Sequence, residues 1–187
     1  MRFQVMIATV IPILPTQEAG IASHLLGTAA CGVAWISSRG KSRLATMLGL
    51  LELFLLFDAI FDWRWSLHGF LVKIAVQLTV YDERTLPQVL LTALLGSVTL
   101  VAAVTTIRHI WERPGASLAI CGGLISAEFW AIEVISLHAI DSILERKVGP
   151  MLIIASVWIV SSALVIVGVL WDARACSHGS RRSVFEG

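Results

Sequence analysis

The sequence predicts an all-α polytopic membrane protein: five transmembrane helices in one bundle, with an additional amphipathic helix at the membrane interface. Hydrophobic residues make up 57% of the 187 residues and charged residues 14%, against about 25% charged residues in ordinary soluble domains. A chain of this length has too little interior to hide so much apolar surface. Residues 1–187 are predicted to form a single integral membrane domain in the lipid bilayer. The net charge of +1 gives no electrostatic argument for nucleic-acid binding.

Five apolar runs are long enough to cross the bilayer. A helix that crosses about 30 Å of hydrocarbon needs about 20 residues. Lipid tails form no hydrogen bonds with the backbone, and a helix satisfies its backbone groups internally, so each crossing segment is predicted to be a helix. The five predicted spans are Gly20–Ser38, Leu44–Trp63, Leu86–Ile107, Ala116–His138 and Pro150–Trp171.

Residues 1–15 are predicted to form an interfacial or re-entrant lead-in to the first span. The apolar run over residues 5–14 is too short to cross the membrane, and Pro12 interrupts it. Thr16 is a suitable N-cap for the helix that follows. Because a basic residue precedes the apolar run, a retained signal peptide is the alternative interpretation.

The segment between the second and third spans also shows a helical pattern. Apolar residues recur at helical spacing from Leu67 to Tyr81. A helix projecting into water would leave this stripe wet, so Ser66–Arg84 is predicted to be an amphipathic helix lying in the interface. Gly69 is the expected position of the bend between this helix and the second span.

The distribution of basic residues predicts the orientation. The short first connection, Ser37–Leu44, carries three basic residues and no acid. Under the positive-inside rule this connection is cytoplasmic. Residues 172–187 then form a cytoplasmic tail and the N-terminus lies outside, in a plasma or inner membrane.

Ionisable residues inside the spans are the main functional signal. An acid at the centre of a membrane helix costs about 2.5–3.5 kcal/mol, and such residues normally face the bundle interior. No predicted span contains Lys or Arg in its core, and Arg64 is expected to reach only the outer edge. The deeper carboxyls are therefore expected to be protonated, share protons as carboxyl pairs, bind a cation or meet a partner subunit's basic residue, rather than form salt bridges within the chain. The acids concerned are Glu52, Asp58, Asp62, Glu128 and Glu133.

One interpretation of these residues is a metal or redox-cofactor site in the outer half of the bundle. Imidazole with carboxylate suits transition metals, and such clusters hold di-iron centres in helical bundles. The candidate metal ligands are His24, Asp58, Glu133 and His138. Haem held by two of His24, His68 and His138 is a variant. The Glu-x-x-His spacing of di-iron sites is absent from the sequence.

Two further interpretations stay open. Chains of Asp, Glu and His mark proton relays in pumps and transporters, which favours a proton or cation pathway through the same five acids. Alternatively, the chain is a non-catalytic subunit or assembly factor whose acids pair with another membrane subunit or a second copy. The sequence contains no H-E-x-x-H or G-x-S-x-G signature of a hydrolase, and it does not decide whether the protein is an enzyme.

Small residues indicate where helices pack closely. The first span contains Ser23-x-x-x-Gly27-x-x-x-Cys31, the fourth contains Gly122-Gly123, and the last contains Ser161-Ser162. Small residues let helix backbones approach in membranes. The second and fourth spans are expected to be neighbours, because their acids would then face a common interior.

Overall fold

The computed structural model describes residues 13–78, 85–109, 111–135 and 142–185, which are almost entirely helical. A two-stranded antiparallel hairpin pairs Lys147 with Leu152 and Val148 with Met151. The elements are α2 (Ile13–Ser37), α3 (Arg43–Phe61), α4 (Trp63–Gln77), α5 (Thr85–His109), α6 (Pro114–Ile135), β1 (Lys147–Val148), β2 (Met151–Leu152) and α8 (Ile153–Phe185).

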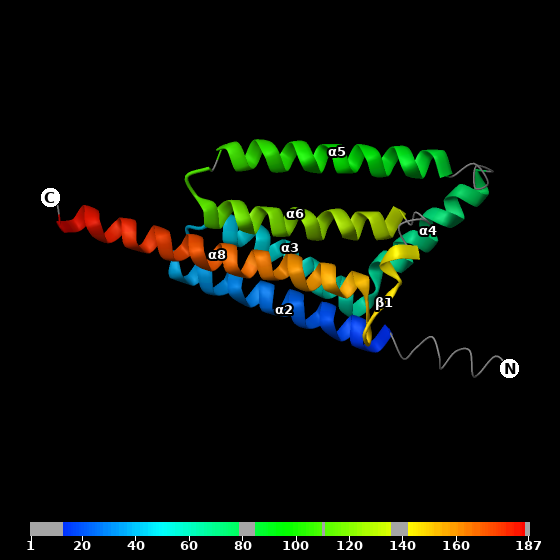
Figure 1. Ribbon diagram of the computed structural model, residues 1–187, viewed down its shortest axis with the longest axis horizontal. Coiled ribbons are helices and arrows are strands. Elements are labelled where there is room, and N and C mark those ends of the chain that lie inside the picture. Colours follow the sequence, from blue (N-terminus) through cyan, green and yellow to red (C-terminus); the bar gives the residue numbers. More distant parts are fainter. Residues whose placement is uncertain (1–12, 79–84, 110, 136–141, 186–187) are drawn as a thin grey trace.

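Five helices in the described part of the chain are long and apolar enough to cross a membrane, which confirms the predicted all-α bundle. They lie within α2, α3, α5, α6 and α8. These helices run along a common direction, and α5 lies at one edge against α6 (Figure 1). The beginning of α2 and the end of α8 lie at opposite ends of the bundle, as an odd number of spans requires. We call the end where α2 and α8 begin the α4 end.

The N-terminal prediction was wrong in one respect. Helix α2 begins at Ile13, so Thr16 lies inside the helix and does not cap it. The Thr16 hydroxyl instead accepts a hydrogen bond from the backbone N–H of Leu152 at 3.0 Å, which ties α2 to the hairpin. The rest of the predicted lead-in, residues 1–12, lies outside the described residues.

A helix is present in the region predicted as Ser66–Arg84: α4 spans Trp63–Gln77, while residues 79–84 lie outside the described part. Its position in the membrane interface stays a prediction. The bend that precedes it falls at Asp62 and not at Gly69. Asp62 has φ +55° and ψ +41°, a left-handed conformation that ends helices and that Asp adopts more readily than most residues. Helix α4 therefore turns away from the bundle direction (Figure 1), and Leu67 and Phe70 remain exposed on it.

Helices α6 and α8 meet through glycines along their shared face. A Cβ atom added at Gly168 would lie 2.4 Å from the Ala119 nitrogen, and one added at Gly122 would lie 2.5 Å from the Ser161 carbonyl oxygen. No side chain fits at either position, so the two backbones are in direct contact. The close packing predicted for Gly122-Gly123 is confirmed.

We expect Gly168→Ala to destabilise the bundle by more than about 1 kcal/mol, because the new methyl group would force two backbones apart. Gly32→Ala is the matched control: Gly32 lies in α2 with no atom within 4 Å of an added Cβ, and the same change there should be neutral or stabilising. Unfolding in mixed micelles measures both. Equal stability of the two variants would contradict the observed contact.

Candidate functional site

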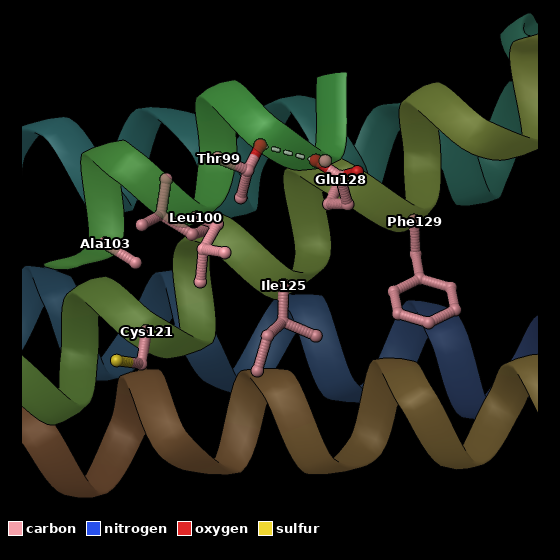
Figure 2. A pocket seen from close by; sticks show the side chains of 9 residues that line it. Thr99, Leu100, Ala103, Cys121, Ile125, Glu128 and Phe129 are labelled. Carbon is pink, nitrogen blue, oxygen red and sulfur yellow. Dashed lines mark hydrogen bonds between the residues drawn. The ribbon is translucent and has the colours of Figure 1, made fainter. Parts of the chain in front are cut away.

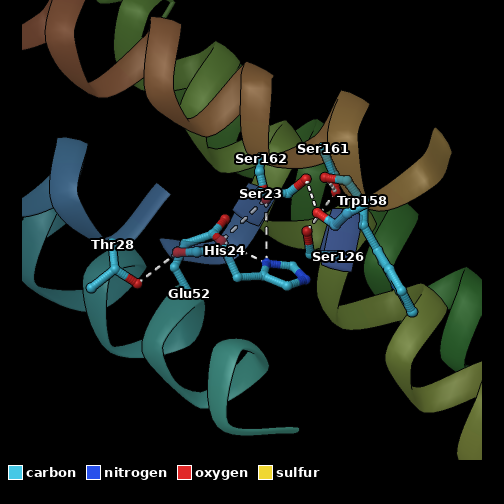
Figure 3. A network of polar contacts seen from close by, with 9 residues as sticks. Ser23, His24, Thr28, Glu52, Ser126, Trp158, Ser161 and Ser162 are labelled. Atoms are coloured by element: carbon cyan, nitrogen blue, oxygen red, sulfur yellow. Dashed lines mark hydrogen bonds and ion pairs between the residues drawn. The ribbon is translucent and has the colours of Figure 1, made fainter. Parts of the chain in front are cut away.

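Three side chains from three helices form a buried polar cluster in the bundle interior (Figure 3). His24 of α2 places Nδ1 2.8 Å from Oε2 of Glu52 in α3. The hydroxyl of Ser162 in α8 donates to the same Oε2 at 3.2 Å and lies 3.3 Å from His24 Nδ1. The exposed fractions of His24, Glu52 and Ser162 are 2%, 0% and 1%. We call these three residues the His24 cluster.

Local sequence explains why the carboxyl group of Glu52 fits beside α2. Gly27 follows His24 by one helical turn, and a Cβ atom there would lie 2.7 Å from Glu52 Cδ and Oε2. The small-residue face that continues to the buried Cys31 therefore does more than pack helices. It leaves the space that Glu52 occupies.

Aromatic and hydroxyl groups of α8 border the cluster. The Trp158 ring lies 6.3 Å from the His24 ring, centroid to centroid. Next to it, Ser126 of α6 donates to the Ser161 hydroxyl at 2.7 Å, and Ser161 donates to the Trp158 carbonyl oxygen at 3.2 Å. The cluster thus has Trp158 on one side and the hydrogen-bonded hydroxyls of Ser126 and Ser161 close by (Figure 3).

The two oxygens of Glu52 differ in their surroundings. Oε2 receives both close contacts from His24 and Ser162, whereas buried Oε1 has no hydrogen-bond partner among the described residues. Buried polar atoms in native proteins are usually satisfied. Chemically, the cluster can hold one proton between Nδ1 and Oε2, with the hydroxyl of Ser162 as a further donor.

A second cluster surrounds Arg64 of α4 and overturns the expectation that the acids have no basic partner in the chain. Arg64 Nη1 lies 3.1 Å from Asp58 Oδ2 and 3.6 Å from Glu133 Oε2. The Arg64 backbone N–H donates to Asp58 Oδ1 at 2.8 Å, and Nη2 lies 3.6 Å from Asp62. The guanidinium carbon also lies 4.7 Å from the Trp158 ring centroid. Arg64 reaches these groups because the turn at Asp62 starts α4 beside the end of α3.

Glu128 lies apart from both clusters. Its Oε2 accepts a hydrogen bond from the Thr99 hydroxyl of α5 at 2.5 Å. Helices α3 and α6 are in contact, as predicted, with the rings of Phe54 and Trp130 5.1 Å apart. Their acids nevertheless divide among three places instead of lining a common interior.

The residues predicted as metal or haem ligands are not brought together in the described part of the chain. No three His, Cys, Asp or Glu side chains there converge as a metal site requires. His24 pairs with Glu52, whereas Asp58 and Glu133 surround Arg64. His68 donates from Nδ1 to the Val134 carbonyl oxygen at 3.1 Å. His138 lies outside the described residues.

Sequence reasoning missed an ion pair at the end of the bundle opposite α4. Arg113, just before α6, donates from Nε to Asp172 Oδ1 of α8 at 3.0 Å. The hydrogen bond with Asp172 raises the pKa of Arg113 above its ordinary value, so this guanidinium stays charged. The available signal was Asp172 at the end of the last predicted span, together with Arg113 in the connection between the third and fourth spans. The ion pair links the start of α6 to α8, in addition to the contact through glycines.

We expect Arg64→Met to destabilise the protein by about 3–5 kcal/mol, because it leaves the buried carboxyl of Asp58 without its charged partner. Lys73→Met is the matched control, since Lys73 is exposed on the same helix and its loss should change stability little. Adding Asp58→Asn to Arg64→Met should recover part of the loss. Thermal unfolding in detergent measures all three, and an unaffected Arg64→Met variant would count against the ion-pair cluster.

No family model, curated protein or solved structure matches the chain. Of the three places where the acids lie, the His24 cluster combines complete burial, a carboxyl–imidazole pair and a carboxyl oxygen with no hydrogen-bond partner among the described residues. It is the candidate functional site of this integral membrane protein.

Proposed function

We propose that the protein is a multi-pass membrane protein that takes up and releases a proton at the His24–Glu52 pair, as one step of a proton or cation pathway. The observation that carries this proposal is the 2.8 Å contact between Nδ1 and Oε2 of two fully buried groups inside the bundle. Ionisable residues at such positions are rare and mark proton relays and ion pathways in membrane proteins.

A purely structural role accounts less well for the arrangement. Burying a pair of titratable groups is expensive, and well-packed apolar residues of the same volume often give equal or greater stability. A purely structural ion pair would also give both carboxyl oxygens hydrogen-bond partners, yet Glu52 Oε1 has no hydrogen-bond partner among the described residues. An oxygen held in this way is available to a transient partner such as a proton or a water molecule.

The metal interpretation receives less support than the proton interpretation. Even a catalytic zinc site uses three protein ligands. The His24 cluster supplies one imidazole and one carboxylate within the described residues. That set is sufficient for a shared proton, which requires one donor and one acceptor atom.

In the proposed mechanism, the proton moves between Nδ1 of His24 and Oε2 of Glu52, while the Ser162 hydroxyl donates to Oε2. Exchange with the outside occurs toward the α4 end. There the Trp158 ring contacts both the His24 ring and the Arg64 guanidinium. Beyond it lies the Asp62 side chain, which is 50% exposed.

We expect Glu52→Gln to abolish both proton uptake and proton flux. In wild-type protein, a pH step should give an infrared difference band for a buried carboxyl group, and proteoliposomes with an imposed pH gradient should transport protons. Glu18→Gln, an exposed acid on the same helix as His24, is the matched control and should retain both signals.

The outcomes separate the competing interpretations. Wild-type protein that is folded but gives neither the band nor any flux would overturn the proposal and favour a non-catalytic membrane subunit. Stoichiometric metal or a haem spectrum in purified protein, lost in His24→Ala, would favour the metal interpretation.

We also propose that the N-terminus lies outside and the C-terminus in the cytoplasm of a plasma or inner membrane. The bundle puts the beginning of α2 and the end of α8 at opposite ends, and the basic connection Ser37–Leu44 favours the cytoplasm for its own end. A reporter active only in the cytoplasm, fused after Gly187, should be active. Activity of an exported reporter at the same position would reverse the orientation.

A further inference from the structure

A cavity of about 330 Å³ lies between α5 and α6, away from the His24 cluster. Its volume is at the lower end of the range for small-molecule sites. Its walls are apolar, and its polar groups are the carboxyl of Glu128 and the hydroxyl of Thr99 (Figure 2). The apolar wall residues include Leu100, Ala103, Ile125 and Phe129.

The carboxyl group of Glu128 is oriented but not neutralised by its neighbours. Thr99 donates to Oε2 at 2.5 Å, and no Lys, Arg or His of the described residues pairs with Glu128. Oε1 lies beside Gly96, at ordinary contact distance (3.5 Å) from the position that a Cβ atom of residue 96 would take. The cavity therefore has one acidic group in an otherwise apolar wall.

The cavity borders the lipid-facing side of the bundle. No residue in the most apolar stretch of α5 is buried. Leu100 is among the exposed large apolar residues of this helix. A ligand dissolved in the bilayer can thus enter between α5 and α6 without crossing the packed interior. Such a ligand must itself be apolar over most of its surface.

We propose that this cavity binds a membrane-soluble amine, with its ammonium group on the Glu128 carboxylate and its apolar part along the cavity walls. Charge complementarity favours an amine as the ligand. A carboxylate in an apolar membrane cavity is costly, and a cation with N–H donors offsets that cost through a charge-assisted hydrogen bond. A neutral chain would fill the walls and leave the carboxylate unpaired. This site is independent of the proposed function.

The test uses decylamine and decanol, two probes that share one chain and differ in the charged head group. Equilibrium binding is measured on the full chain in phosphatidylcholine nanodiscs. Wild-type protein should bind one decylamine saturably, at least about tenfold more tightly than Glu128→Gln does. Glu112→Gln, an acid outside the cavity, should bind like wild type.

A second variant covers the case in which Glu128→Gln does not fold. Ala103→Trp should fill the cavity and abolish decylamine binding while the protein keeps its helical spectrum and its elution volume. Equal decylamine binding by wild type and folded Glu128→Gln would overturn the proposal. So would decanol that binds wild type as tightly as decylamine, or decylamine binding that survives Ala103→Trp.

Discussion

The direct backbone contact between α6 and α8 is the constraint on which the rest of the bundle depends. Glycines at positions 115, 122 and 168 bring the two helices closer than any side chain would allow. Helix α8 also packs along α2, which in turn packs on α3. As a result, α8 places Ser162 against the His24–Glu52 pair. It also places Trp158 between that pair and Arg64.

The hydrocarbon environment explains why the acids are distributed as they are. Lipid offers no hydrogen bonds, so each acid must find a partner inside the protein. Glu52 contacts the His24 imidazole, and Glu128 accepts a hydrogen bond from the Thr99 hydroxyl. Asp58 and Glu133 both lie near the Arg64 guanidinium. Only the partner of Glu52 is an imidazole, a side chain whose ring nitrogens can either donate or accept a proton. That difference distinguishes a candidate functional pair from a structural ion pair.

The two proposed sites lie between different helices of the bundle. The His24 cluster is enclosed by α2, α3 and α8, where side chains are almost completely buried. The cavity at Glu128 lies beside α5. Among the five spans, α5 has the smallest share of buried residues in its most apolar stretch. Enclosure suits a small transferable ion such as a proton, whereas a boundary with lipid suits an amphiphile. Their separation allows each site to be altered without the other.

The sequence by itself determined the five spans and the small-residue faces, because hydropathy and residue size are local properties that sum along a helix. It also identified His24 and Glu52 as unusual, since a titratable residue within an apolar run is visible without any fold. The partners of these residues were decided only by the tertiary structure. Glu52 meets Ser162 across 110 positions of sequence, and Arg64 reaches Asp58 and Glu133 because one residue, Asp62, adopts a left-handed turn. Such pairings depend on how each helix is rotated against its neighbours, and that rotation is set by the backbone contacts of the whole bundle, not by any local pattern.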